Sequence, residues 1–190
     1  GRSGDRGQNS LPPVSNWASW QIMKALGIAE RELLARFECI QPMYNLVKRQ
    51  VEVEVLPLAL SEQMGVIPYS PLGAGLLTGK YGRKDRPDGG RLQENPMYVR
   101  RYSLDWYYDT AEDFVTYARG KGYSPVSLAV AWVLSHPAVT APIIGARNLA
   151  QLEPSLDAVN IPVSPAMRAE ISAFSPTPAP ATDRLEEQVK

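Results

Sequence analysis

Cysteine and histidine are nearly missing from this sequence. It contains one cysteine, Cys39, and one histidine, His136, in 190 residues. A single cysteine cannot form an intrachain disulfide, which excludes a disulfide-stabilised secreted fold and favours a reducing compartment. Cys39 lies in an apolar run, where we expect a buried structural thiol. His136 lies in a Ser-His-Pro turn, where we expect a capping or packed side chain rather than a catalytic base.

The sequence also lacks net charge and long apolar runs. Lys and Arg together number 20, as do Asp and Glu, so no excess charge directs the chain to nucleic acid or acidic lipid. No apolar run approaches the roughly 18–20 residues of a membrane span. The first ten residues contain no apolar segment of the kind found in secretory signals. We therefore expect a cytoplasmic globular protein with no nucleic-acid or membrane partner.

The segment 65–81, which reads GVIPYSPLGAGLLTGKY, has the composition of a nucleotide site. An apolar run ending at Pro68 is typical of a buried strand. Tyr69 then offers a ring for stacking, Gly73 and Gly75 allow close backbone approach, and Lys80 adds a cation. Ligands of parallel α/β folds bind at the carboxyl ends of strands. An ordinary strand followed by a turn and a helix start would show the same pattern, so both interpretations stay open.

Hydrophobic periodicity and capping residues predict the other elements. Strands are expected at 36–42, 65–68 and 139–144, and helices at 17–26, 51–64, 98–120, 125–134, 149–158 and 165–174. We expect Gly27 to end the first helix and Pro57 to disturb the second. The helix at 125–134 is apolar nearly all round and should be buried. The polar segment 82–96 is expected to be a functional lid or disordered.

Strands separated by helices indicate a parallel sheet with right-handed crossovers. Each predicted strand ends in a candidate ligand-binding residue, namely Gln41, Tyr69 and Gly145. This arrangement is typical of an arc of a (β/α)₈ TIM barrel, with its chemistry at the carboxyl face. Because a full barrel needs roughly 250 residues, the sequence predicts a partial barrel.

Four motifs resemble the aldo-keto reductase family, in its order and spacing. They are Val14–Trp17 (VSNW), Gln41–Leu46 (QPMYNL), Pro68–Tyr81 (PYSPLGAGLLTGKY), and Pro142–Arg147 (PIIGAR) followed by Gln151-Leu152-Glu153. The resemblance covers residues 14 to about 175 and is strongest to bacterial and fungal members related to the potassium-channel beta subunits. It implies the C-terminal half of the barrel, the cofactor NADPH, and reduction of small aldehydes and ketones.

The resemblance also implies a role for each cofactor-binding residue. Ser15, Asn16 and Gln41 would hydrogen-bond the nicotinamide carboxamide, and Tyr69 would stack on the nicotinamide ring. The segment after Tyr69 would wrap the pyrophosphate, mostly with backbone N–H groups. Its residues are Ser70, Pro71, Leu72, Gly73, Gly75 and Leu76, of which Pro71 has no N–H. Lys80 and Arg91 would bring charge to the phosphates, and Gly145, Arg147 and Gln151 would hold the adenosine end. Arg147 is the candidate for the 2′-phosphate. Pro154 and Ser155 depart from the family pattern, which has an acid and an amide there, and this weakens the adenine anchor.

The catalytic residues are the main absence. The family's Asp, Tyr, Lys and His lie in its N-terminal half, and no motif here matches them. We therefore predict no catalytic residue and no metal site in this chain, and an oxidoreductase that is inactive alone. The alternative is a non-catalytic NADPH-binding or regulatory module. A third hypothesis is an interaction surface formed by aromatic residues, which we expect to lie in the core instead. These aromatic residues are Tyr98, Tyr102, Trp106, Tyr107 and Tyr108.

The N-terminal segment differs from the family. Members approach the SNW motif through a strand resembling GKIRYLGV, whereas residues 7–14 here read GQNSLPPV. Codons can be chosen for Gly7–Pro12 that, read one base later, encode Gly-Lys-Ile-Arg-Tyr-Leu. We therefore expect residues 1–13 to be an aberrant leader, followed by the half barrel at 14–175 and a loosely held tail at 176–190. The expected consequence is that the strand before Ser15 is missing and the barrel cannot close.

Overall fold

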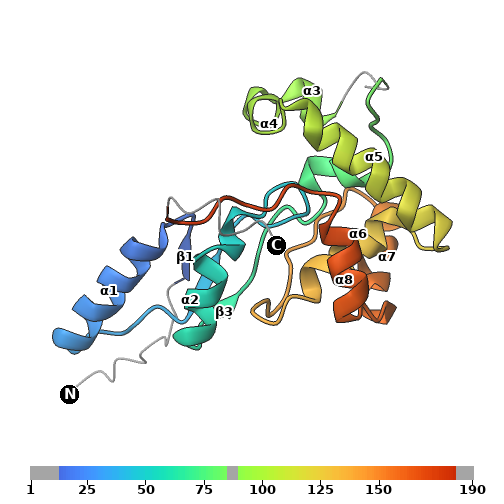
Figure 1. Cartoon of the computed structure of the whole chain (residues 1–190). Coiled ribbons are helices and arrows are strands. Elements are labelled where there is room, and N and C mark those ends of the chain that lie inside the picture. Colours follow the sequence, from blue (N-terminus) through green and yellow to red (C-terminus); the bar gives the residue numbers. More distant parts are fainter. Residues whose placement is uncertain (1–12, 85–89, 183–190) are drawn as a thin grey trace, which may run out of the picture.

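The computed structural model describes residues 13–84 and 90–182, and the side chain of Arg91 is outside that description. The predicted leader therefore lies outside the described residues, apart from Pro13. Figure 1 shows a small sheet with α1 and α2 beside it, and a group of helices, α5 to α8, at the other end of the molecule. Residues from both ends belong to a continuous hydrophobic core.

The sheet is parallel and has three short strands in the order β1-β2-β3. These are β1 (Pro13–Ser15), β2 (Cys39–Gln41) and β3 (Gly65–Val66). Backbone hydrogen bonds continue past β3, because Ile67 N donates to Ile40 O at 3.0 Å and Tyr69 N donates to Pro42 O at 2.9 Å. An α/β fold with a parallel sheet is thus confirmed. The expectation of no strand before Ser15 is wrong, since β1 pairs with β2 from Pro13 onward.

The predicted strand at 139–144 is an extended segment without a regular strand. It runs beside β3, with Thr140 N donating to Val66 O and Ile143 N donating to Pro68 O, both at 2.8 Å. The residue numbers rise together on both sides, so the two segments are parallel. Pro142 has no N–H to donate, which breaks the ladder that a regular strand requires.

Two helices cover one face of the sheet. Val14, Ile40 and Val66 point to this face and are buried. Helix α1 (Ser19–Arg31) buries Ile22, Leu26 and Ala29, and α2 (Val55–Ser61) buries Leu56 and Ala59 in the same core. Side chains alternate across a strand, so Ser15, Cys39 and Gln41 lie on the opposite face, where they are exposed or half-buried. Cys39 is therefore half-buried rather than a buried core thiol.

The helical end is built around α6 (Pro125–Leu134). Seven consecutive residues of α6, Ser127–Val133, are buried, as the sequence predicted. Around it lie α5 (Asp105–Gly120), α7 (Leu149–Leu156) and α8 (Pro165–Ser172). The remaining helices are α3 (Arg91–Glu94), α4 (Pro96–Arg101) and the 3₁₀ turns η1 (Gln50–Glu52), η2 (Gly73–Thr78) and η3 (Asp157–Asn160).

Several predicted boundaries differ from the structure. Gly27 does not end α1, because the helix continues to bury Ala29. Pro57 lies in the first turn of α2, where its missing N–H is not needed, so the helix begins at Val55 rather than earlier. The predicted helix at 98–120 is two helices that break around Tyr102, which is buried. The segment 82–96 contains α3, and its residues 85–89 lie outside the described part of the chain.

The aromatic residues at 98–108 belong to the core. Tyr102, Tyr107 and Tyr108 are buried, and Tyr98 and Trp106 pack against the core half-buried, which argues against an aromatic docking surface. The predicted loose tail is partly placed, because Gln50 Nε2 donates to Ala179 O at 3.4 Å. Among the residues described, no helix has the length and apolar character needed to cross a membrane.

Candidate functional site

The ends of β1 and β2 bring three of the predicted site residues together. Ser15 lies opposite Gln41 in the parallel register, and Ser15 Oγ donates to Gln41 O at 2.9 Å. Asn16 follows directly and has a φ of 58°, a left-handed conformation that asparagine tolerates better than most residues. This turn directs the chain from β1 into α1 and leaves Asn16 at the strand end.

Tyr69 joins the same edge from the segment after β3. Its hydroxyl donates to Asn16 Oδ1 at 2.9 Å. Its backbone is held on both sides, because Tyr69 N donates to Pro42 O and Tyr44 N donates to Tyr69 O at 3.3 Å. The structure therefore places Ser15, Asn16, Gln41 and Tyr69 at one edge of the sheet, as the sequence predicted from separate motifs.

The glycine-rich segment after Tyr69 forms a tight series of turns. Ser70, Gly73, Ala74 and Gly75 all have φ between 56° and 98°. Two non-glycine residues in this conformation are strained, and such strain is concentrated at functional sites. Gly73 N donates to Ser70 O and Gly75 N to Leu72 O, each at 3.0 Å, so these two N–H groups close turns rather than point outward. Pro71, Gly73 and Leu76 are buried, whereas Ser70, Leu72 and Gly75 are half-buried.

Asn45 holds the glycine-rich segment in place, a role that the sequence did not reveal. Its side chain is fully buried. Asn45 Nδ2 donates to Ser70 O at 2.9 Å and to the Tyr102 hydroxyl at 3.3 Å, while Asn45 Oδ1 accepts from Val47 N. Burial raises the pKa of Tyr102 to about 12, so its hydroxyl stays protonated. The only sequence signal for this role is that Asn45 is a polar residue in an otherwise apolar loop.

The predicted adenosine-binding residues follow the extended segment beside β3. Ile143 is hydrogen-bonded to Pro68, so Gly145 continues from a residue beside the Tyr69 strand end. Arg147 N donates to Gln151 Oε1 at 3.1 Å, and Asn148 caps α7. Gly145, Arg147 and Gln151 are exposed, as is Lys80. Within the described residues, neither Arg147 nor Lys80 forms an ion pair.

A cleft of about 670 Å³ lies beside the Asn16 side of this edge. Asn16 is the one predicted site residue that lines it, beside Trp17 and Met43. Trp106 and residues 175–178 also line it. The cleft therefore includes Asn16, the hydrogen-bond acceptor of Tyr69, but none of Gly145, Arg147 and Gln151.

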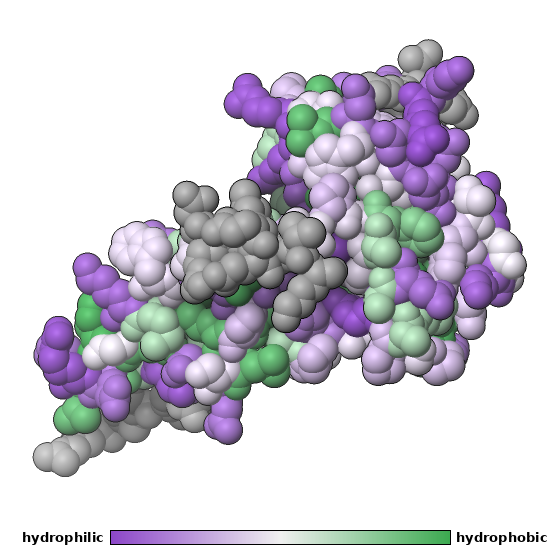
Figure 2. Space-filling model, in the orientation of Figure 1, coloured by the Kyte–Doolittle hydropathy of each residue, from purple (hydrophilic) through white to green (hydrophobic). Residues whose placement is uncertain are grey.

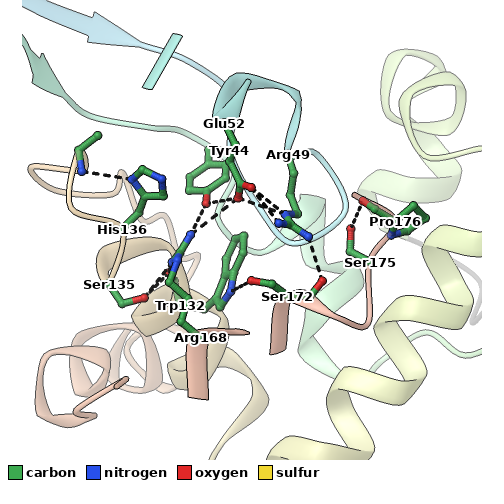
Figure 3. A network of polar contacts seen from close by, with 11 residues as sticks. Tyr44, Arg49, Glu52, Trp132, Ser135, His136, Arg168, Ser172, Ser175 and Pro176 are labelled. Atoms are coloured by element: carbon green, nitrogen blue, oxygen red, sulfur yellow. Dashed lines mark hydrogen bonds and ion pairs between the residues drawn. The ribbon is translucent and has the colours of Figure 1, made fainter. Parts of the chain in front are cut away.

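A buried polar network supports the loop between β2 and α2 (Figure 3). The Tyr44 hydroxyl donates to Glu52 and accepts from Arg168 Nη2 at 2.6 Å, while Arg49 Nη2 pairs with Glu52 at 2.8 Å. Arg168 also donates to the carbonyl of Trp132 and packs over its ring at 4.6 Å. The network joins α8 and α6 to the loop that holds Tyr69.

Electrostatics within the network favour the charged form of Glu52. Burial alone would raise the pKa of Glu52, but hydrogen bonds from Arg49 and Tyr44 outweigh it and leave the pKa below its usual value. Burial raises the pKa of Tyr44. His136 Nδ1 accepts from Ala138 N at 3.2 Å, and the ring meets Tyr44 edge-on. Burial lowers the pKa of His136, as does the nearby Arg168 charge, and the half-buried ring is packed as expected.

A known protein family matches most of this chain. A sequence profile of the Aldo/keto reductase family matches residues 10–176. This chain belongs to the aldo/keto reductase family. The match covers every motif from Val14 to Gln151, and the family implies a (β/α)₈ fold, a nicotinamide cofactor and oxidoreductase chemistry.

Curated members of the family are identical to this chain at about a third of the matched positions. The uncharacterized oxidoreductase YrpG of Bacillus subtilis is 33% identical over 168 residues, which are 88% of this chain and 49% of YrpG. Protein tas of Escherichia coli is 33% identical over 84% of this chain and 46% of its own length. A probable voltage-gated potassium channel subunit beta of Arabidopsis thaliana is 32% identical over 83% of this chain and 49% of its own length. The chain thus spans about half the length of these relatives.

Proposed function

We propose that this chain is the cofactor-binding half of an NADPH-dependent aldo-keto reductase that reduces aldehydes or ketones to alcohols. One observation carries the proposal. Ser15, Asn16, Gln41 and Tyr69 come from three separate segments, and parallel pairing gathers them at one edge of the sheet. The amide and hydroxyl groups match a carboxamide, which needs both a donor and an acceptor, and the ring of Tyr69 matches a flat heterocycle.

The nicotinamide cofactor supplies the hydride when it is bound. This chain's residues would bind and orient it. Tyr69 is itself oriented by its hydrogen bond to Asn16 and by backbone bonds on both sides, so its ring is held in place before the cofactor arrives. Such preorganisation lowers the entropy cost of binding. The strained turns from Ser70 to Gly75 would lie against the pyrophosphate, and Asn45 would hold them there.

Arg147 supports NADPH as the cofactor in preference to NADH. The side chain of Arg147 is exposed. Its backbone N–H donates to the side-chain oxygen of Gln151, four residues later in the sequence. Guanidinium matches the geometry of a 2′-phosphate and pairs with it through two hydrogen bonds.

We place the carbonyl substrate in the cleft beside Asn16. Asn16 both lines the cleft and accepts the hydrogen bond of Tyr69, so a ligand there would lie next to the nicotinamide end. Trp17, Met43 and Trp106 give the cleft an apolar wall suited to a flat or aliphatic carbonyl compound.

Cofactor titration tests the proposal. NADPH and NADH are added to the chain while its tryptophan fluorescence is recorded. We expect NADPH to bind more tightly, Y69A to weaken both nucleotides, and R147M to weaken NADPH by about tenfold or more while leaving NADH unchanged. The matched control is R31M, which removes another exposed arginine, on α1. Equal affinity for the two nucleotides, or an R147M variant that binds like R31M, would contradict the proposal.

The second candidate is a non-catalytic NADPH-binding module. The similarity to the Arabidopsis protein named as a potassium channel subunit beta favours it. No residue of this chain matches the family's Asp, Tyr, Lys and His, so we propose that the chain alone binds cofactor without turnover. The test is NADPH oxidation by the purified chain in the presence of an aromatic aldehyde. Steady oxidation at enzyme rates would show that this chain holds its own proton donor.

A further inference from the structure

The cleft beside Asn16 carries an unbalanced positive charge. Among the described residues that line it, the charged ones are Lys48 and Arg49, and neither an aspartate nor a glutamate is present. Arg49 is neutralised by Glu52, whose Oε2 lies 2.8 Å from Arg49 Nη2. Lys48 forms no ion pair with any residue that the structure describes. The cleft therefore has one cation that is not paired with a carboxylate of the described chain.

Tyrosine side chains fix the position of this cation. Lys48 Nζ donates to the Tyr107 hydroxyl at 2.7 Å, and it lies 4.4 Å from the centre of the Tyr107 ring. The centre of the Tyr102 ring is 5.5 Å from the same Nζ. Lys48 is half-buried and both tyrosines are buried. A cation that is held in place and partly withdrawn from water attracts an anion more strongly than an exposed one, because water and salt screen it less.

The pair formed by Lys48 and Tyr107 keeps hydrogen-bond donors in reserve. An ammonium group has three N–H donors, of which Tyr107 accepts one. The Tyr107 hydroxyl accepts that bond, and its own proton is donated to no other residue that the structure describes. An ammonium and a hydroxyl side by side match the two oxygens of a carboxylate, and the hydrogen bond from the ammonium is charge-assisted.

The other walls of the cleft are suited to a flat apolar group. Trp17, Met43 and Trp106 line it, and the Trp106 and Tyr107 rings lie 4.2 Å apart between their centres. The volume of about 670 Å³ is in the range of small-molecule sites. Ring faces stabilise an aromatic ligand but contribute nothing to an inorganic anion. The cleft therefore matches a ligand with an aromatic body and one anionic end.

We propose that Lys48 and Tyr107 form a carboxylate-binding subsite, and that the substrate is an aromatic aldehyde or ketone that carries a carboxylate. The carbonyl group in this statement rests on the proposed function, whereas the carboxylate subsite rests on the cleft alone. Lys48 supplies the charge, Tyr107 supplies a hydroxyl donor, and Trp106 contacts the aromatic body. Asn16 lines the same cleft, so one ligand can span from Lys48 toward the proposed nicotinamide position.

Two probes of nearly the same shape test the subsite. The full chain is titrated by calorimetry with 4-acetylbenzoate and, separately, with its methyl ester, in the absence of any nucleotide. Both compounds have the same ring and ketone, and the ester lacks the negative charge. We expect the carboxylate to bind about tenfold or more tightly than the ester, because only the carboxylate pairs with Lys48.

Substitutions at the subsite assign this preference to its residues. K48M keeps the length of the side chain and removes the charge, so it should abolish the preference, while K48R should retain it. Y107F keeps the ring and should weaken 4-acetylbenzoate alone, by about threefold. The matched control is K121M, because Lys121 also lies over a tyrosine ring, at 5.5 Å from Tyr117, but is exposed and does not line the cleft. Circular dichroism checks that each variant is folded.

Three results would overturn the subsite. They are equal binding of the two probes to the unaltered chain, a K48M variant that keeps the preference, and a K121M variant that loses it as K48M does. Nucleotide binding is measured separately, so the two proposals can fail independently. A preference that depends on Lys48 in a chain that binds neither NADPH nor NADH supports the subsite and contradicts the proposed function. Nucleotide binding without the preference does the reverse.

Discussion

The two ends of the molecule complete their cores to different degrees. In the helical end, α6 is buried over Ser127–Val133 because α5, α7 and neighbouring turns surround it. In the strand end, residues 13–69, the sheet buries Val14, Ile40 and Val66 on one face and leaves the opposite face open. Figure 2 shows apolar residues at the surface of the strand end, over α1 and α2. The helical end thus buries α6 on all sides, whereas the sheet is covered on one face.

The polar network of Arg168, Tyr44, Glu52 and Arg49 connects these two ends. Arg168 belongs to α8, while Tyr44, Arg49 and Glu52 belong to the loop that follows β2. The glycine-rich segment and Tyr69 are held by this same loop. The helical end therefore supports the edge of the sheet that carries Tyr69.

The largest effect is expected from core truncation in the helical end. W132A removes a side chain that is 1% exposed, and should lower the free energy of unfolding by about 3–5 kcal/mol. W20A removes the same side chain from α1 in the strand end, where it is 65% exposed, and should cost less than about 1 kcal/mol. Urea denaturation measures both. Similar losses for the two variants would contradict the contrast between the ends.

Breaking the network should have the next largest effect. R168M leaves the half-buried Glu52 with one fewer cation and removes the hydrogen bond to Tyr44, at a cost of about 2–4 kcal/mol. The matched control is R83M, which breaks exposed ion pairs with Asp109 and Asp113 and should cost less than about 1 kcal/mol. Unfolding curves at neutral pH compare them. An R168M variant as stable as R83M would show that the network does not join the two ends.

Lowering the pH should destabilise the region of the Arg168–Tyr44–Glu52 network in two steps. The folded pKa of His136 is lowered, so its contribution is complete above the unfolded value of 6.5 and is lost as pH falls through the folded pKa. Glu52 behaves likewise below its unfolded value of 4.5. Unfolding free energy measured from pH 7.5 downward should therefore fall first with a slope of at most about 1.4 kcal/mol per pH unit, the value for one proton. H136N should remove this first slope and keep the second.

The smallest expected effect is an increase in stability from a substitution in the strand end. Gly27 lies inside α1 with no atom within 4 Å of a Cβ built there, so G27A should stabilise the chain by about 0.5–1 kcal/mol. The opposite sign is expected for G79A, because Gly79 has a φ of 82° and its Cβ would lie 2.8 Å from Arg119 Nη2. Thermal unfolding measures both changes. A destabilised G27A would mean that α1 needs flexibility at this point.

The grouping of the strand-end residues was more predictable than the element boundaries. Tyr69 and Gln41 were expected at strand ends because each follows an apolar run, and Asn16 was expected from the VSNW motif; the structure brings all three to one edge of the sheet. Asn45 was missed because a buried asparagine looks like any loop asparagine until its partners are known. Gly27 was misjudged because its helix-propensity cost of about 1 kcal/mol gives way to burial of neighbouring residues such as Ala29. Pro57 was misjudged because it lies in the first turn of α2, where proline is tolerated.

The sequence by itself determined the family and singled out the strand-end residues Gln41 and Tyr69, since those depend on short motifs whose chemistry is local. It also determined the burial of α6, because an all-round apolar helix has no other stable environment. Only the tertiary structure decided that β1 pairs with β2, that one face of the sheet is open, and that Arg168 connects α8 to the loop after β2. These features join residues far apart in the chain, and their energies depend on which surfaces meet rather than on any local pattern.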